Sequence, residues 1–409
     1  MRVILNGVST LKPKTGVGHT TAHLHRALRD LAPGDDFWLY PGGVLSRAAR
    51  RALGRPNQPD RRPGSVKTGG APVPPGSGSG QSRGVKARLT AVAKAAYHTH
   101  FAAAARWGGF DLYHEPNFVP VRTHLPTVVT VHDLSVLLHP DWHPADRVAF
   151  HDRHFRRGLD RADHVVVVSE SVRREVVEVL GFAPGRVTAV HNGVGDQYHP
   201  QPAAVTDAAR RRLGLPARYL LAVGTIEPRK NIGTLLRAFC DLPADARAAC
   251  PLVLAGGWGW KSGPDRDLFE AEARRRGAVH LGYVADADLP ALYAGAAALL
   301  YPSFYEGFGL PPAEMLACGG GVVASTAAAV REVVGGHAWL LDPLDLAGWR
   351  DAMREIATDP DCLDGFRRGG VAHARQFTWD GAARRTLSVY RGVLGVADPV
   401  AAPPSRRAA

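Results

Sequence analysis

The sequence predicts an α/β protein built from two domains, each a doubly wound parallel sheet with helices on both faces. Short apolar runs alternate along most of the chain with amphipathic segments, a pattern typical of parallel βαβ units. The chain has 409 residues, of which 45% are hydrophobic, so it is long enough to bury two separate cores. No segment approaches the ~20 consecutive apolar residues that cross a bilayer.

The first half opens with a strand, a glycine turn and a helix. Residues 2–5 are strand-like, with an apolar run at residues 3–5, and Gly16 and Gly18 lie in a turn that leads into a segment with Leu24 and Leu28 on one side. This βα unit leaves its loop open to a ligand. Alternatively, the glycines of this turn are present only because the packing leaves no room for a side chain.

Polar residues stand directly after three later strands of the first half. His132 and Asp133 follow the apolar run at residues 127–131, and Ser169 and Asn192 follow runs of their own. Ligands of doubly wound sheets bind at the carboxyl ends of the strands, so these positions are candidates for a site. The chain has 18 histidines, and most of them are expected to be packing or surface residues. His132 is the strongest candidate for a site residue among them because it lies at the end of a strand.

The second half repeats the pattern after a proline-flanked stretch. A strand at residues 219–224 is followed by a loop that carries Arg229 and Lys230, and then by a helix. An adjacent Arg and Lys on a loop are usually a solvated pair. Between a buried strand and the start of a helix they are better placed to hold a phosphate group.

The stretch from residue 301 to residue 325 combines two acids with a glycine-rich loop. Two apolar runs flank the string EGFGLPPAE, in which Pro311 and Pro312 can begin a helix but hardly sit inside one. We therefore expect Glu306 in the loop and Glu314 in the first turn of the helix. The loop N–H groups lie beside the positive end of the helix dipole, which suits an anionic ligand. Each acid taken alone could be structural.

Four motifs together resemble the family-4 retaining glycosyltransferases. EGFGLPPAE resembles the E-x7-E signature of that family, and TGVGHT resembles its N-terminal glycine loop. HDLS resembles its T-x-HDL segment, especially in the mannosyltransferase-like branch, and VGTIEPRKN resembles its VG-x-x-x-PRKN motif. The motifs arrive in the family's order. The resemblance implies the GT-B architecture, in which two Rossmann-like domains face each other across a cleft.

The resemblance also implies a role for each matching residue. Glu306 and His132 contact the donor sugar from opposite domains, whereas Arg229 and Lys230 hold the leaving diphosphate. Glu314 binds the ribose hydroxyls of the nucleotide. The remaining donor contacts come from the glycine loop at Gly16 and Gly18, from the sugar and diphosphate loop at Gly307, Phe308, Gly309 and Leu310, and from backbone groups near the nucleobase at Tyr283 and Val284.

The reaction implied by the resemblance is transfer of a hexose from a nucleotide diphosphate sugar to an acceptor hydroxyl, with the anomeric configuration retained. It needs no metal and no cofactor. GDP-mannose is the preferred donor because HDLS and EPRKN look mannosyltransferase-like, and a UDP-sugar is the other option. The acceptor is a growing polysaccharide, a lipid-linked glycan or a small glycoside.

Two positions depart from the family's pattern. Gly321 stands where relatives usually have proline in ACG-x-PVVAS, and Arg331 stands where they have proline in SSLPE. These changes are expected to alter the flexibility or the charge of the loop that follows the strand at residues 322–325. They bear on sugar specificity and on the level of activity.

The expected domain organisation follows from the motifs and from composition. Residues 1–200 form an acceptor-side domain and residues 201–375 form a nucleotide-sugar-binding domain. Residues 376–396 form a helix that crosses back to the first domain. Residues 55–85 are rich in Pro, Gly and Ser and form a disordered insertion, and residues 397–409 form a disordered tail.

The net charge of +12 is concentrated in the first half. Residues 1–200 hold 26 Lys and Arg against 16 Asp and Glu. A basic surface could meet an anionic membrane, and the helix-like stretch at residues 86–107 could lie on it, although a helix packed on the sheet is favoured. We find no base-reading motif and expect no nucleic-acid partner. The four cysteines show no metal-ligand spacing, which favours a cytoplasmic protein, or one at the inner face of the membrane.

Two other functions stay open. The chain could be a catalytically weakened sugar-nucleotide-binding scaffold subunit, because the GT-B fold alone does not establish activity. It could also bind nucleic acid through its basic first half, an option that we rank last.

Overall fold

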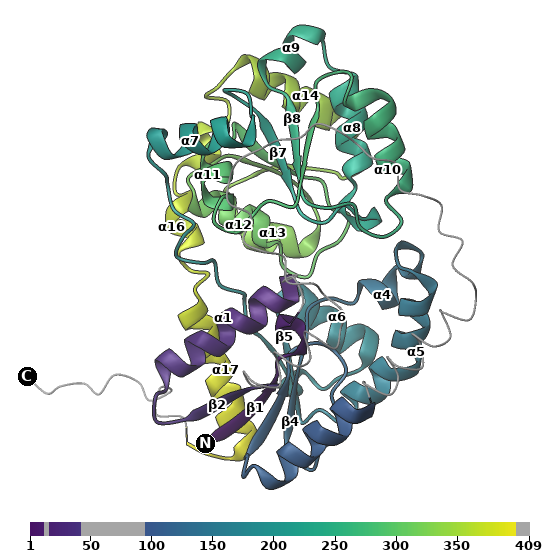
Figure 1. Cartoon of the computed structure of the whole chain (residues 1–409), viewed down its shortest axis with the longest axis vertical. Helices are drawn as coiled ribbons and strands as arrows, with labels where there is room; N and C mark the ends of the chain where they lie inside the picture. Colours follow the sequence, from purple (N-terminus) through teal and green to yellow (C-terminus); the bar gives the residue numbers. More distant parts are fainter. Residues whose placement is uncertain (12–15, 42–94, 398–409) are drawn as a thin grey trace, which may run out of the picture.

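The computed structural model describes residues 1–11, 16–41 and 95–397 (Figure 1). The expected insertion at residues 55–85 lies outside the described residues, as do residues 398–409 of the expected tail. The described chain forms two six-stranded parallel sheets with helices around them, which confirms the predicted fold class.

The first sheet has the strand order β2-β1-β3-β4-β5-β6. Its strands are β1 (Arg2–Asn6), β2 (Asp36–Tyr40), β3 (Leu112–Glu115), β4 (Thr127–Val131), β5 (His164–Val167) and β6 (Val187–Ala189). The helices of this half are η1 (Val8–Thr10), α1 (Gly16–Leu31), an unlabelled helix at residues 95–107, α4 (Ser135–Leu138), η2 (Pro140–Trp142), α5 (Ala145–Leu159), α6 (Glu170–Leu180) and η3 (Pro184–Arg186).

The second sheet has the order β12-β11-β10-β7-β8-β9. Its strands are β7 (Leu220–Val223), β8 (Leu252–Ala255), β9 (Val279–Gly282), β10 (Ala298–Tyr301), β11 (Val322–Ser325) and β12 (Trp339–Leu341). The helices after residue 200 are α7 (Ala203–Leu213), η4 (Pro228–Lys230), α8 (Ile232–Cys240), α9 (Ala244–Ala249), α10 (Gly263–Leu268), η5 (Phe269–Ala273), α11 (Leu289–Ala294), α12 (Leu310–Ala317), α13 (Ala328–Val334), α14 (Leu346–Thr358), α15 (Asp364–Arg367), α16 (Gly370–Ala374) and α17 (Trp379–Leu394).

Both faces of the second sheet are buried, as a doubly wound sheet requires. Along β7, Leu220 and Ala222 belong to the core on one face, and Leu221 belongs to the core on the other. Successive side chains of a strand point to opposite faces, so a strand covered on both sides must be apolar throughout. The all-apolar sequence of β7 is therefore the local cause of the layered fold.

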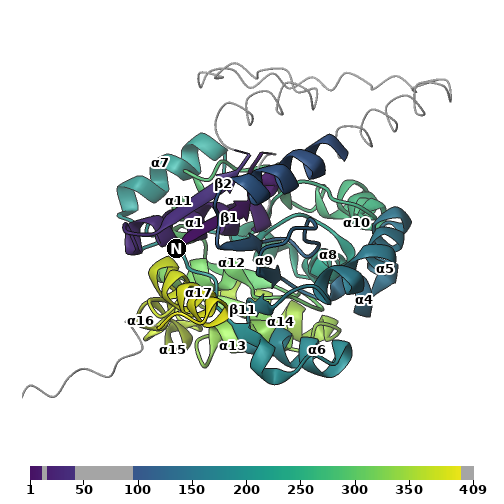
Figure 2. The ribbon, with the colours of Figure 1, turned by 90° about the horizontal axis from the view of Figure 1, so that it is seen from below.

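The last helix, α17, returns to the first sheet. Its Leu387 and Tyr390 are buried in one core with Val3 and Leu5 of β1. Figure 1 shows this yellow helix beside the purple α1, and the view from below agrees (Figure 2). Helix α17 lies inside the expected crossing segment at residues 376–396, and the division into domains at residues 200 and 375 stays a prediction.

The helix at residues 95–107 packs on the first sheet. Phe101 and Ala105 are buried against Tyr40 and Tyr113. The described part of the stretch at residues 86–107 therefore follows the favoured interpretation of a helix packed on the sheet.

Candidate active site

A buried cluster of two cations and two acids lies at the carboxyl ends of β7 and β10. Lys230 Nζ lies 2.5 Å from Oε1 of Glu306, and Arg229 pairs with Oε2 of the same carboxylate. Arg229 Nε also lies 2.5 Å from Glu227. All four side chains are less than one-fifth exposed. The structure thus brings together Arg229, Lys230 and Glu306, three residues that the motifs had singled out from distant parts of the sequence.

The charges of this cluster stabilise one another. Burial by itself acts to raise the pKa of Glu306, but Arg229 and Lys230 outweigh it and lower that pKa to about 2. Burial lowers the pKa of Lys230, and Glu306 opposes this effect. Glu306 is therefore ionised at neutral pH, and the cluster holds fixed charges in a site that excludes most water.

The loop after Glu306 touches the other half of the molecule. Ser169 Oγ donates a hydrogen bond of 2.7 Å to the carbonyl oxygen of Gly307. A Cβ at position 307 would collide with the carbonyl oxygen of His132, so only glycine permits this approach. The glycine-rich loop of the second half therefore lies directly against the backbone of His132 in the first half. Glu306, the residue before Gly307, lies next to this contact.

The GFG loop ends in a left-handed residue that starts α12. Gly309 is the N-cap of the helix, with φ of 106°, and Phe308 is buried against Phe377. The helix begins at Leu310, so Pro311 and Pro312 occupy its first turn, where no N–H is needed. Our expectation that Glu314 lies in the first turn was wrong: with a start at Leu310 it falls in the second.

Glu314 is half-buried, and tyrosines hold its carboxyl group. Tyr293 of α11 donates a hydrogen bond of 2.8 Å to its Oε2. Burial raises the pKa of Glu314 to about 7, although the hydrogen bonds from Tyr293 and Tyr198 act to lower it. The carboxyl group therefore titrates near neutral pH, unlike Glu306, and the two acids of the signature differ in charge state because only one of them has cations beside it.

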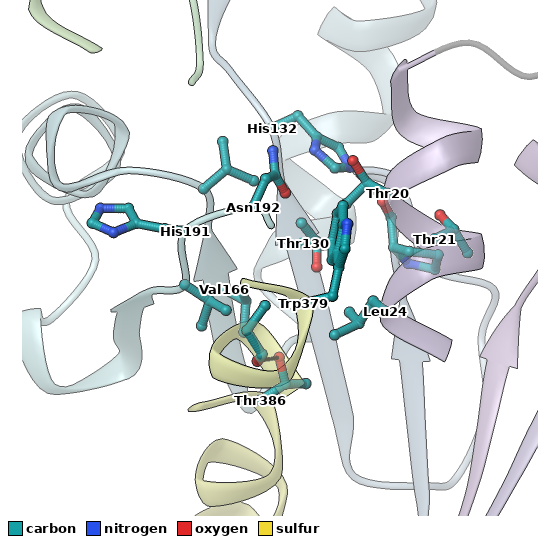
Figure 3. Close-up of a pocket in the computed structure, with 14 residues that line it drawn as sticks. Thr20, Thr21, Leu24, Thr130, His132, Val166, His191, Asn192, Trp379 and Thr386 are labelled. Atoms are coloured by element: carbon teal, nitrogen blue, oxygen red, sulfur yellow. Dashed lines mark hydrogen bonds between the residues drawn. The ribbon is translucent and has the colours of Figure 1, made fainter. Parts of the chain in front are cut away.

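His132 lines a pocket at the carboxyl ends of the strands of the first sheet. Its Nε2 lies 2.8 Å from the carbonyl oxygen of Pro116, and burial lowers its pKa, so the ring is neutral and Nε2–H is the donor. Figure 3 shows His132, Asn192 and Thr20 around the indole of Trp379. Helices α1 and α17 and the ends of β4 and β6 therefore meet at this pocket.

The predicted glycine loop lies at the start of α1. Gly16 has open space around it, whereas Gly18 is buried in the first turn. The next residue, His19, has its Nε2 3.7 Å from Asp286 of the other half. The loop thus lies across from the segment that follows β9.

That segment contains the two residues predicted near the nucleobase. Tyr283 is 72% exposed, and its hydroxyl lies 3.4 Å from Asp286. Val284 is buried in the core of the second sheet. The side chain of Val284 is therefore committed to packing, and the predicted base contacts through backbone groups stay a prediction.

The two departures from the family pattern have different surroundings. A Cβ at Gly321 would lie 2.6 Å from Cδ1 of the buried Leu363, so the space that a larger residue needs is already filled. Arg331 is exposed on α13. The next residue, Glu332, bonds with His191 of the first half at 2.7 Å.

Sequence reasoning missed several partners of the site residues. Tyr293, Glu227 and Tyr301 all contact a predicted site residue, and Tyr301 accepts a hydrogen bond of 2.8 Å from Lys230. Glu227 directly precedes the PRKN string and could have been found as its neighbour. Tyr293 lies 21 residues before Glu314 with no motif to mark it.

The described residues contain neither a metal-binding cluster nor a membrane-spanning helix. Residues 1–11, 16–41 and 95–397 contain no group of three or more His, Cys, Asp or Glu arranged to hold a metal ion. Over the same part of the chain, no helix is long and apolar enough to cross a membrane.

The fold is that of an α/β protein with two parallel sheets, and comparison with known proteins identifies its family. Residues 15–198 match the family described as Glycosyltransferase Family 4, and residues 206–370 match Glycosyl transferases group 1. The chain therefore belongs to the glycosyltransferases that these two family descriptions cover.

Individual relatives agree with this assignment. The chain is 36% identical to O-antigen chain mannosyltransferase B of Escherichia coli over 281 residues, which cover 68% of this chain and 74% of that protein. It is 30% identical to the serotype-specific mannosyltransferase WbdA of Escherichia coli over 66% of this chain, but spans only 34% of that longer protein.

The solved structures support the fold. Sucrose-phosphate synthase from Thermosynechococcus elongatus superposes with a TM-score of 0.67 at 21% identity, over 96% of this chain and 99% of that one. This likeness extends over both sheets and supports the expected GT-B architecture.

Proposed function

We propose that this glycosyltransferase moves mannose from GDP-mannose to a hydroxyl of a growing polysaccharide chain, with retention of the anomeric configuration and without a metal ion. The observation that carries the proposal is the buried cluster of Arg229, Lys230 and Glu306 at the carboxyl ends of β7 and β10. The identity of 36% to an O-antigen mannosyltransferase supports the sugar and the polysaccharide acceptor. A UDP-sugar donor and a lipid-linked or small glycoside acceptor are the alternatives.

The charges of the cluster suit the departure of a nucleoside diphosphate. Breaking the anomeric C–O bond places negative charge on the diphosphate and positive charge on the sugar ring. Arg229 and Lys230 stabilise the first charge, and the amides before α12 add to their effect. The ionised Glu306 and the neutral His132 orient the sugar from opposite sides.

The acceptor hydroxyl attacks on the face that the diphosphate leaves. A C–O bond to the acceptor forms as the bond to the diphosphate breaks, and the hydroxyl proton goes to a phosphate oxygen of the leaving group. No covalent enzyme intermediate is needed. The ribose hydroxyls bind Glu314, and the Gly16 to Gly18 loop closes on the donor from the first half.

A donor screen tests this function. The purified protein is incubated with GDP-mannose, UDP-glucose, ADP-glucose and dTDP-glucose, with and without a methyl α-mannobioside, in the presence of EDTA. We expect slow hydrolysis of GDP-mannose, faster transfer when the acceptor is present, and an α-linked product by NMR. Tight donor binding without hydrolysis or transfer would favour the scaffold function instead. An inverted product or loss of activity with EDTA would contradict the proposed mechanism.

The location of the reaction is part of the proposal. We place it in the cytoplasm, at the inner face of a membrane, because the first half is basic and Trp107 is 78% exposed at the end of its helix. Co-sedimentation with vesicles that contain anionic lipids checks this contact. Equal retention by neutral vesicles, or none by either kind, would argue against it.

A further inference from the structure

The residue before Glu306 connects the candidate active site to the first half of the molecule. Tyr305 lies in the loop between β10 and α12, and its hydroxyl donates a hydrogen bond to Oε2 of Glu175 on α6. The same hydroxyl accepts the backbone N–H of Leu134 at 3.0 Å. A phenolic hydroxyl has one hydrogen to donate and lone pairs to accept, so these two contacts are compatible. The Tyr305 side chain therefore crosses from the second half to the first.

The backbone around Tyr305 is held by one of the two cations of the cluster. Arg229 Nη1 donates a hydrogen bond of 3.2 Å to the carbonyl oxygen of Tyr305, and the N–H of Phe304 donates to the carbonyl oxygen of Arg229 at 2.8 Å. Nη1 of Arg229 also pairs with Glu306. Arg229 thus contacts three consecutive residues of the loop, so a shift of the loop at Tyr305 displaces the Glu306 carboxylate and the guanidinium together.

The Tyr305 hydroxyl stays a neutral donor. Burial is the main cause that raises its pKa, and Asp133 and Glu175 raise it further. Burial also raises the pKa of Glu175, whereas the hydrogen bond from Tyr305 lowers it and Asp133 raises it. The hydrogen bond therefore stabilises the charged form of Glu175 at the contact between the two halves, and it is stronger to a carboxylate than to a neutral acid.

Fixed charges act on a reacting bond only from the right place, and a displacement of about 1 Å can cost about 100-fold in rate. We propose that Tyr305 is a positioning residue, which places Glu306 and Arg229 correctly when the two halves close. Its hydroxyl does so through its contacts with Glu175 and Leu134, which fix the loop against the first half. This inference rests on the proposed function, because it concerns the geometry of the same site.

The test compares variants of the full chain. Tyr305→Phe keeps the ring and removes only the hydroxyl, and Glu175→Leu removes the carboxylate from the other side of the contact. Glu175→Gln keeps an oxygen that can accept the hydrogen bond. Lys261→Met is the matched control: Lys261 also bonds across the two halves, to the carbonyl oxygen of Asp141 at 2.6 Å, but from the loop after β8.

Each variant is assayed with GDP-mannose, with and without a methyl α-mannobioside, and thermal unfolding shows that it is folded at the assay temperature. We expect Tyr305→Phe to lower kcat by about 10- to 100-fold and to leave the KM for GDP-mannose within about threefold. Hydrolysis and transfer should fall by the same factor, because both require departure of the diphosphate.

The partner variants test whether the effect passes through Glu175. Glu175→Leu should lose as much turnover as Tyr305→Phe, and the double variant should lose no more than either single variant. Glu175→Gln should recover most of kcat, and Lys261→Met should keep kcat within about twofold. If Tyr305→Phe does not fold, the comparison of Glu175→Leu with Glu175→Gln still decides the matter.

Three results would overturn the inference. A lower Tm with kcat unchanged in Tyr305→Phe would assign the hydroxyl to stability alone. Equal losses of kcat in Lys261→Met and Tyr305→Phe would show that closure in general sets the rate. A double variant whose loss is the product of the single losses would show that Tyr305 and Glu175 act independently.

These results all leave the wild type active, so they do not touch the proposed function. A wild type that neither hydrolyses nor transfers from any sugar nucleotide would contradict the proposed function, and this inference would fall with it. The two failures are therefore distinguishable.

Discussion

The carboxylate of Glu332 and the imidazole of His191 join the two halves of the molecule, with Oε1 2.7 Å from Nε2. The same carboxylate accepts the backbone N–H groups of Glu170 and Ser171, at 2.8 and 2.9 Å. These N–H groups belong to the first turn of α6, so an acid on α13 of one half caps a helix of the other. The hydrogen bonds lower the pKa of Glu332, although burial acts to raise it.

Glu332→Ala should weaken this connection. We expect a loss of about 1–3 kcal/mol in the free energy of unfolding, because one contact with His191 and two helix N–H groups lose their acceptor. The KM for the sugar nucleotide should also rise, since the closed arrangement is less favoured. Denaturant unfolding and steady-state kinetics check both effects. The adjacent Arg331→Ala, at an exposed position, serves as the control and should change stability by less than about 0.5 kcal/mol.

Lys230→Met should reduce turnover of the sugar nucleotide at least about 100-fold, because a fixed positive charge near the leaving group is lost. It should also destabilise the protein by up to about 3 kcal/mol, since the buried Glu306 loses one of its two cationic partners and keeps Arg229. The double variant Lys230→Met/Glu306→Gln separates the two effects: stability should return and turnover should not. Near-normal turnover by the single variant would remove Lys230 from the mechanism.

Glu314 should make stability depend on pH. Its pKa in the folded protein is about 7, above its ordinary value of 4.5. A carboxyl group with a raised pKa contributes stability that is fully present below pH 4.5 and is lost as pH rises through 7. Glu314→Gln should therefore gain stability relative to the wild type by about 2–3 kcal/mol over this window.

Chemical denaturation at several pH values measures the difference between Glu314→Gln and the wild type. Glu115, whose pKa burial also raises to about 7, is present in both proteins, so its contribution cancels. The variant Glu115→Gln should show a slope of the same sign. A difference that does not change with pH would show that Glu314 is not protonated near pH 7.

Tyr390→Phe should loosen α17 from the first sheet. The hydroxyl of Tyr390 lies 2.6 Å from Nδ1 of the buried His114, whose Nε2 lies 2.8 Å from Thr130. Removing the hydroxyl leaves a buried nitrogen unpaired, at a cost of about 1–3 kcal/mol. Thermal unfolding should show a lower Tm with kcat unchanged. Arg384→Ala, on the exposed side of the same helix, is the matched control.

Much of this fold could be predicted from local patterns. The apolar runs that end before His132 and Arg229 are β4 and β7, and both residues lie at carboxyl ends of strands as expected. Strand and turn preferences are local, so they can be read over a few residues. The start of α12 was misplaced because prolines are tolerated in the first turn as well as just before it.

The sequence by itself determined the class of fold and the family, because hydrophobic periodicity and the order of motifs can be read from the residues alone. It also predicted a short list of site residues, which stays a prediction. Only the tertiary structure decided which residues meet. Tyr293 reaches Glu314 because α11 and α12 pack together within the second half, whereas Glu332 caps α6 and Trp260 lies beside His143 where the two halves meet. Such contacts join residues far apart in the chain, and no local preference encodes them. The charge states of Glu306 and Glu314 follow from the same packing, since cations surround only the first.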